Sequence, residues 1–126
     1  MSLKPYAIEY GLGIDLHGQD PTKAAIRAVR TAIEHVSLPG MRQITGVTDL
    51  NSQVHVEITL GVPAEFMDRI DAERVKAALP FGQRSVNVVQ GGLLTTSGSV
   101  ADWLGDSSDQ AVLVVAAIAV KLEAQG

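Results

Sequence analysis

An acid and a histidine two residues apart are the clearest candidates for chemistry in this sequence. Asp15 and His17 close an alternating segment, Tyr6 to His17, and side chains two apart on a strand point to the same face. A carboxylate and an imidazole at that spacing can bind one divalent metal ion, such as zinc. They can equally form an acid–base pair in which Asp15 orients the ring and His17 moves a proton. We therefore predict a catalytic or metal site at this pair.

Small and polar residues surround the pair and favour a ligand there. Gly11 and Gly13 share its face of the strand, so a ligand or another backbone can approach closely. Gly18 permits a turn, and Asp20 before Pro21 predicts a helix start, whose amides suit an anion. We predict that a small anionic molecule is received by five residues: Gly11, Gly13, Gly18, Gln19 and Asp20.

Any further metal ligand or catalytic base has to lie on the same face of the sheet as Asp15 and His17. Glu9 lies on the face predicted for Asp15, and we include it as a candidate catalytic base. His55 and Glu57 share the polar parity of a second strand, so His55 becomes a metal ligand if the two strands are neighbours. The alternative is that His55 and Glu57 belong to an ordinary exposed face, and that Asp15 and His17 are a capped surface feature.

The first half of the chain predicts three strands and a helix that position these groups. The segment Tyr6 to His17 alternates apolar and polar residues, which is typical of a strand with one buried face. The apolar stripe after Asp20 predicts a helix that ends at Leu38-Pro39-Gly40. Met41 to Thr48 predicts a strand that forms a hairpin with the clearly alternating Gln53 to Val62.

The second half predicts one further strand and two helices. A polar helical stretch begins at Pro63 and stops at Pro80, and a β-branched strand covers Ser85 to Val89. Leu93 to Thr96 follows a double glycine and leads into a turn. Asp109 to Ala124 is apolar nearly all round, which we interpret as a helix that is central or buried in a subunit interface.

These elements predict an α+β fold with two layers, formed by a single domain that spans residues 1–126. A mixed four-stranded sheet would carry about three helices on one face. The other face would then carry the polar residues of the alternating strands and would be either exposed to solvent or covered by another subunit. These polar residues are Glu9, Asp15, His17, His55 and Glu57.

Composition excludes several classes of function. The formal net charge of −4 disfavours general binding of nucleic acid, and the absence of cysteine excludes disulfides and thiolate metal sites. The longest apolar run, Ala111 to Val120, is ten residues, whereas a membrane span needs about 20. We therefore expect a cytoplasmic protein with no membrane or nucleic-acid partner, and a homo-oligomer because of its apolar last helix.

The segment from Ile8 to Asp20 resembles the signature of a small uncharacterised family of bacteria and plants. The family pattern Gly-x-Gly-x-Asp-x-His-Gly is matched by Gly11, Gly13, Asp15, His17 and Gly18. This resemblance covers the whole chain and implies no activity, since the function of that family is unassigned.

A shorter stretch of about ten residues is similar to the opening strand of methylerythritol cyclodiphosphate synthase. That resemblance implies that Asp15 and His17 bind a divalent metal ion, and that the protein has a compact α+β fold assembled as a trimer or a similar ring. The enzyme takes a further histidine from elsewhere, and only His35 and His55 are available in this sequence.

Two hypotheses of different classes follow. The first is a metal or acid–base site on the first strand, acting on a small anionic metabolite. The alternative is a non-catalytic oligomeric binding or scaffold protein, in which Asp15 and His17 serve the structure of a turn or a subunit contact.

Overall fold

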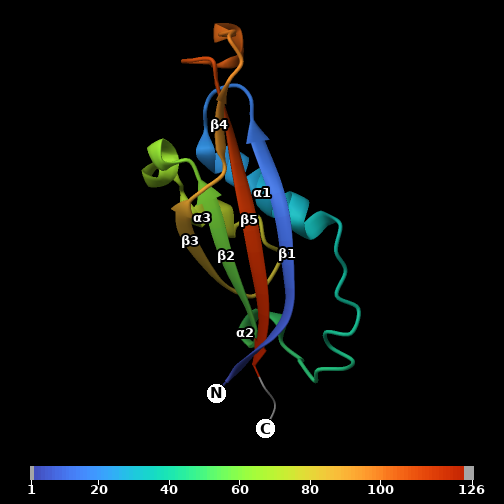
Figure 1. Ribbon diagram of the computed structural model, residues 1–126. Helices are drawn as coiled ribbons and strands as arrows, with labels where there is room; N and C mark the ends of the chain where they lie inside the picture. The colour runs from blue at the N-terminus through green and yellow to red at the C-terminus, as the bar shows by residue number, and fades with distance from the viewer. Residues whose placement is uncertain (1, 124–126) are drawn as a thin grey trace.

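The structure, a computed structural model, describes residues 2–123 and consists of one sheet with helices on one of its faces (Figure 1). In chain order the elements are β1 (Leu3–Asp15), α1 (Pro21–Glu34), α2 (Leu50–Gln53), β2 (Val54–Val62), the 3₁₀ helix η1 (Ala64–Arg69), α3 (Ala72–Lys76), β3 (Gln83–Gln90), β4 (Leu93–Thr96), the 3₁₀ helix η2 (Asp102–Leu104) and β5 (Gln110–Glu123). No helix within these residues has both the length and the apolar character required to span a membrane.

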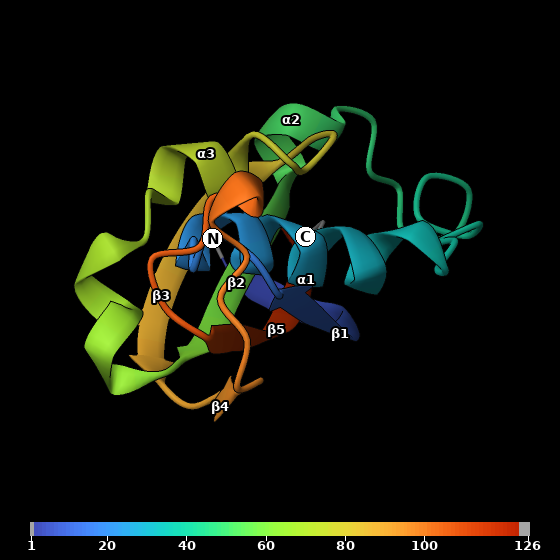
Figure 2. The same ribbon diagram turned by 90° about the horizontal axis from the view of Figure 1, so that it is seen from above.

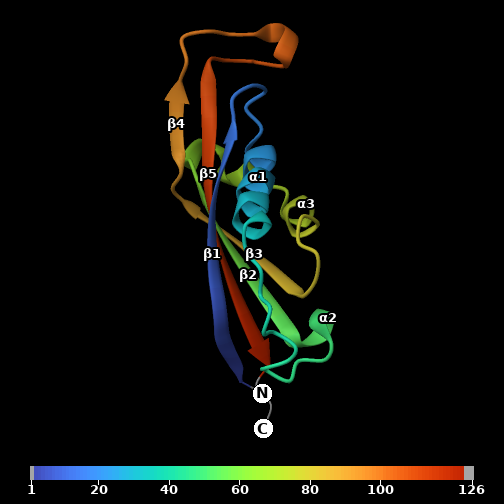
Figure 3. The same ribbon diagram turned by 90° about the vertical axis from the view of Figure 1, so that its right-hand side faces the viewer.

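The sheet has the strand order β1-β5-β2-β3, and the short β4 also pairs with β5. The pair β2–β3 is parallel, whereas β5 runs antiparallel to β1, β2 and β4. Figures 2 and 3 show α1, α2 and α3 on the same side of the sheet. The predicted two-layer α+β fold is therefore confirmed, with five strands in the mixed sheet where four were predicted.

Helix α1 begins where its capping signals predict. The Asp20 carboxylate accepts hydrogen bonds from the backbone N–H groups of Thr22 and Lys23, and Pro21 occupies the first turn, where its missing N–H costs nothing. The helix ends at Glu34, a few residues before the predicted stop at Leu38-Pro39-Gly40. Its alanine-rich face packs on the sheet and is buried through Ala24, Ala25, Ala28, Val29 and Ala32.

The prediction of a helix over Asp109 to Ala124 is wrong. Residues 110–123 form β5, the strand that lies between β1 and β2, and residue 124 lies outside the described residues. A central strand with apolar side chains on both faces gives a continuous apolar run, which periodicity alone does not distinguish from a buried helix.

Two other predicted elements differ in the structure. Met41 to Thr48 forms turns and irregular chain, so the predicted hairpin with the following strand is absent from the described residues. The polar stretch after Pro63 divides into two short pieces, η1 and α3, because Ile70 and Asp71 between them adopt extended backbone.

The most consequential difference concerns the two faces of β1. Its apolar side chains were expected to face the core, yet Ile8, Tyr10 and Leu12 are exposed. The alternate positions of β1 that are buried against the helices are Glu9, Gly11, Gly13 and Asp15. In β2 the valine and isoleucine parity is buried, so His55 and Glu57 point to the open face, opposite to Glu9 and Asp15. The predicted common polar face is therefore wrong.

Candidate functional site

Gly11 and Gly13 are contact points between β1 and α1. A Cβ atom added to Gly13 would overlap the Ala24 carbonyl oxygen, and one on Gly11 would overlap the Ala28 carbonyl oxygen. The helix backbone therefore occupies the space that the sequence suggested for a ligand. Of the two alternatives that the glycines left open, the structure shows the close approach of another backbone.

Asp15 is a buried acid whose two carboxylate oxygens both have partners in the chain. One oxygen accepts a hydrogen bond from the backbone N–H of Asp20 at 2.8 Å, and the other lies 3.3 Å from a guanidinium nitrogen of Arg27. The same Arg27 nitrogen donates to the carbonyl oxygen of Ile14 at 2.6 Å. These contacts fasten the end of β1 to the first two turns of α1.

Gly18, Gln19 and Asp20 form the turn that joins β1 to α1. Gly18 and Gln19 have positive φ angles of 92° and 50°. Glycine adopts such angles at no steric cost, whereas Gln19 is a non-glycine residue in this region. The Gln19 amide donates to Asp106 at 3.0 Å and to the Gln110 carbonyl at 2.9 Å. Because Asp20 caps α1 with its own side chain, the helix N-terminus predicted to receive an anion is already occupied by this carboxylate.

His17 pairs with an acid, and that acid is Asp106. The Nδ1 atom of His17 lies 2.9 Å from a carboxylate oxygen of Asp106, whose side chain is 1% exposed, whereas the His17 side chain is 43% exposed. Asp106 also accepts hydrogen bonds from the backbone N–H groups of Ala101 and Gly18 and from the Gln19 amide. The His17 contact first, then these donors, hold the pKa of Asp106 well below its usual range.

Asp106 is marked by no local sequence pattern, so its contact with His17 was not predicted. It lies 89 residues after His17, in the irregular chain between η2 and β5. The pairing arises because β1 and β5 are antiparallel neighbours, which brings the chain before β5 to the end of β1. A prediction of β5 as a strand would have been needed to find the contact.

His55 is not brought to Asp15 and His17. Along β5, Asp15 pairs with Val112 and His55 with Lys121, which separates them by roughly 30 Å at the usual rise per residue. The Nε2 atom of His55 lies 3.1 Å from Glu123 instead, and Glu57 forms an ion pair with Lys121 at 2.9 Å. Within residues 2–123 no group of three or more histidine and carboxylate side chains is placed to hold a metal ion.

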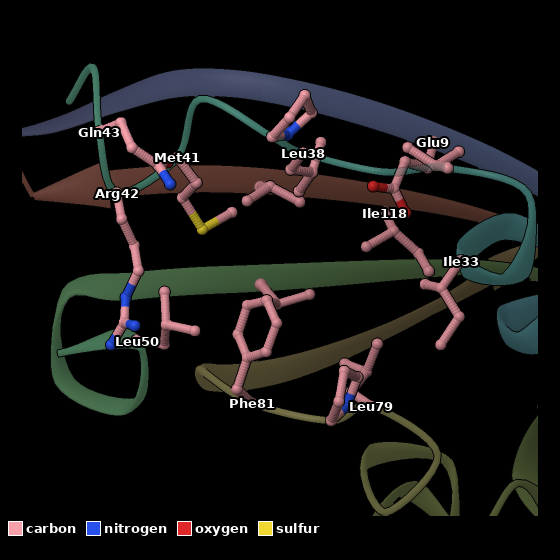
Figure 4. Close-up of a pocket in the computed structure, with 15 residues that line it drawn as sticks. Glu9, Ile33, Leu38, Met41, Arg42, Gln43, Leu50, Leu79, Phe81 and Ile118 are labelled. Atoms are coloured by element: carbon pink, nitrogen blue, oxygen red, sulfur yellow. The ribbon is translucent and has the colours of Figure 1, made fainter. Parts of the chain in front are cut away.

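Glu9 lies on the covered face of the sheet, at the wall of a cavity of about 390 Å³. Its residue is 7% exposed, and burial raises the pKa of its carboxyl group. Figure 4 shows the carboxylate pointing from β1 toward Ile118, with Ile33, Leu38 and Phe81 around the same space. Of the predicted site residues, Glu9 alone faces this cavity.

Comparison with known proteins gives a family and a structural relative. The model of a family of conserved hypothetical proteins, Lin0512_fam, matches residues 5–120, nearly the whole chain. The chain belongs to this Lin0512 family. The family carries no activity in its description, so membership adds support for an uncharacterised protein family and supplies no reaction.

A solved crystal structure has a fold similar to that of this chain. The chain is similar to an FtsZ-like protein of unknown function from Nostoc punctiforme PCC 73102, with 38% identity, 98% coverage of both chains and a TM-score of 0.86. No curated protein matches the sequence. The resemblance to methylerythritol cyclodiphosphate synthase is not among these findings and stays a prediction.

Proposed function

We propose that this Lin0512 protein is a non-catalytic binding or scaffold protein built from several copies of the chain, in which the segment Gly11 to Gly18 has a structural role. The proposal rests on one observation, an exposed apolar surface on the open face of the sheet. We call it the open-face patch, and it consists of Ile8, Tyr10, Leu12, Ile14, Leu93 and Val115.

The open-face patch is continuous across three strands. Ile14 on β1, Leu113 on β5 and Leu93 on β4 occupy one row, and Leu12 pairs with Val115 in the next. Tyr10 is 66% exposed and Ile8 is 56% exposed. From such exposures the patch leaves roughly 600 Å² of accessible surface, which is at the upper end for a monomer and close to one partner's share of a standard interface.

A second copy of this chain is the occupant that this face fits. The charged groups beside the patch are already paired within the chain, Lys121 with Glu57 and His55 with Glu123. The face therefore presents little uncompensated charge that would repel an identical surface or select an oppositely charged protein. β1, a strand of 13 residues, is also an edge of the sheet and contributes four of the patch residues.

The test is the mass of the protein in solution as a function of concentration, for the parent chain and for Leu12→Asp. A carboxylate in the middle of the patch would lose its hydration in a contact between copies, so the variant is expected to be monomeric where the parent is assembled. Ile44→Asp is the matched control, because Ile44 is 84% exposed in the loop after α1 and lies outside the sheet.

The parent and Ile44→Asp should share one assembled mass, and thermal unfolding should show that Leu12→Asp remains folded. A parent chain that is monomeric at every concentration, or a Leu12→Asp variant with the parent's mass, would contradict the proposal. Binding of the parent to lipid vesicles without self-association would assign the patch to a membrane surface instead.

A second candidate function is favoured by the contact between His17 and Asp106. A histidine that ligates a metal through one ring nitrogen usually donates a hydrogen bond from the other, often to a carboxylate. Nδ1 of His17 has such a partner in Asp106. In this candidate the exposed side of the ring binds a divalent ion or exchanges a proton with a small anionic molecule, as the spacing of Asp15 and His17 first suggested.

Zinc binding by the purified protein tests this second candidate. Titration with zinc ion should show a site that His17→Ala removes and that His35→Ala retains, since His35 is an exposed histidine at the end of α1. Equal zinc binding by the parent and His17→Ala would rule out His17 as a ligand.

A further inference from the structure

The cavity beside Glu9 exists because the helix is much shorter than the strands it covers. α1 has 14 residues and extends about 21 Å, whereas the 14 residues of β5 extend about 46 Å. Beyond Glu34 the sheet is covered by the irregular chain that contains Leu38 and Met41, and by the turn at Leu79 to Phe81. These segments enclose about 390 Å³, within the range of small-molecule sites.

The walls of this cavity are mostly apolar. Ile33 from α1, Leu38 and Met41 from the following chain, and Phe81 from the turn before β3 surround it, and the sheet contributes the side chains of Ile118 and Val120. Figure 4 shows Ile33, Leu38, Phe81 and Ile118 around one space between the strands and the covering chain. Such walls favour the apolar body of a ligand.

Glu9 is the buried charged residue of this lining. The residue is 93% buried, since 7% of its surface is exposed, and within residues 2–123 no hydrogen bond or ion pair is made by its carboxylate. The carboxylate oxygens keep some contact with water through the cavity, so a ligand that enters displaces this water and has to supply a compensating donor. The other charged residue of the lining, Arg42, is exposed and donates to the Thr48 carbonyl oxygen at 3.2 Å.

We propose that this cavity binds a small molecule with an apolar body and a protonated amine, which pairs with the Glu9 carboxylate. An amine supplies the donor and the opposite charge that Glu9 lacks, and charge-assisted hydrogen bonds are the strong ones. A purely apolar ligand would leave the carboxylate unpaired, and an anionic ligand would be repelled by it. Glu9 sets the class of ligand, and the apolar walls set its size.

This inference is independent of the self-association proposed above. The cavity lies on the face of the sheet that α1 and the chain after it cover, whereas the open-face patch lies on the opposite face. Figure 3 shows α1, α2 and α3 on one side of the sheet only. Loss of either property by mutation is expected to leave the other in place, so the two proposals fail separately.

The experiment uses three probes that each carry a phenyl group on a three-carbon chain, 3-phenylpropylamine, 3-phenylpropan-1-ol and 3-phenylpropanoate. Binding is followed by two-dimensional NMR of the full chain, which reports both affinity and the residues affected. The amine is expected to bind at least about tenfold tighter than the alcohol, and the propanoate is expected to bind weakest. Binding should change the NMR chemical shifts of the cavity residues Leu79 and Phe81.

Glu9→Gln identifies the group that recognises the amine. It removes the charge and keeps the shape, so amine binding should weaken by about tenfold or more while alcohol binding is unchanged. Glu73→Gln is the control, because Glu73 is 84% exposed and lies outside the cavity. The inference is overturned if the amine binds no tighter than the alcohol in the parent, if Glu9→Gln binds the amine like the parent, or if no probe shifts the cavity residues.

Discussion

At the scale of single residues, the glycines of β1 are packing residues rather than ligand-binding ones. Gly11 and Gly13 let the backbone of α1 lie directly on the strand, where any side chain would overlap helix backbone. The two glycines predicted the close approach of either a ligand or another backbone segment at these positions. The residues alone did not decide this, because the apolar parity of β1 suggested the wrong buried face.

Gly13→Ala tests this role through the free energy of unfolding. The added methyl group meets backbone atoms that cannot rotate away, so the variant is expected to lose about 3 kcal/mol or more. Gly61→Ala is the matched control on β2, because a Cβ atom there would lie 3.4 Å or more from its neighbours. Its expected cost in chemical denaturation is about 1 kcal/mol or less. Equal losses for the two variants would contradict the packing role.

At the scale of elements, the structure follows the sequence where one face of an element meets water and departs from it where both faces are apolar. Asp20, Pro21 and a single apolar stripe predict α1, and the alternation in Val54–Val62 predicts β2. β5 has apolar residues on both of its faces. One face packs against α1 and the other lies on the open face of the sheet, so its sequence resembles that of a buried helix. Its β-branched residues, among them Val112, Val114 and Val120, were the signal for a strand.

The same misassigned strand explains how much of the candidate site was predictable. The sequence predicts Asp15 and His17 as chemically notable, and the structure gives both of them specific partners. Those partners are Asp20 and Arg27 nearby, and Asp106 far away in sequence. A contact across antiparallel neighbours depends on the strand order, which the sequence pattern does not contain.

The contact between Asp106 and the β1–α1 turn predicts a pH-dependent stability. The folded-state pKa of Asp106 lies below its ordinary value of 3.8, so its contribution to stability is present above pH 3.8 and is lost as the pH falls toward the folded-state pKa. Asp106→Asn should therefore lower the unfolding temperature at neutral pH. The difference from the parent should shrink as the pH falls below 3.8.

Thermal unfolding of the parent and Asp106→Asn over this pH range measures the effect. Asp68→Asn provides the comparison, because Asp68 lies in η1 and takes no part in the hydrogen bonds that join Asp106 to the turn. A gap between parent and Asp106→Asn that stays constant from neutral to acidic pH would contradict a stabilising carboxylate at this position.

At the scale of the whole molecule, the sheet divides two surfaces of different character. One face packs against α1 and the chain that follows it, and encloses the cavity at Glu9. The other face leaves Ile8, Tyr10, Leu12 and their neighbours exposed. Because exposed apolar surface of this extent is costly in water, the isolated chain is expected to be the incomplete form of the protein.

Chemical labelling of Tyr10 tests this central claim most directly. Tyr10 is 66% exposed in the single chain and lies within the open-face patch. Mass spectrometry after nitration of the concentrated parent protein should show Tyr10 protected, and dilution or the Leu12→Asp substitution should make it reactive. Rapid nitration of Tyr10 in the concentrated parent, at the rate seen for Leu12→Asp, would show that no second copy covers this face.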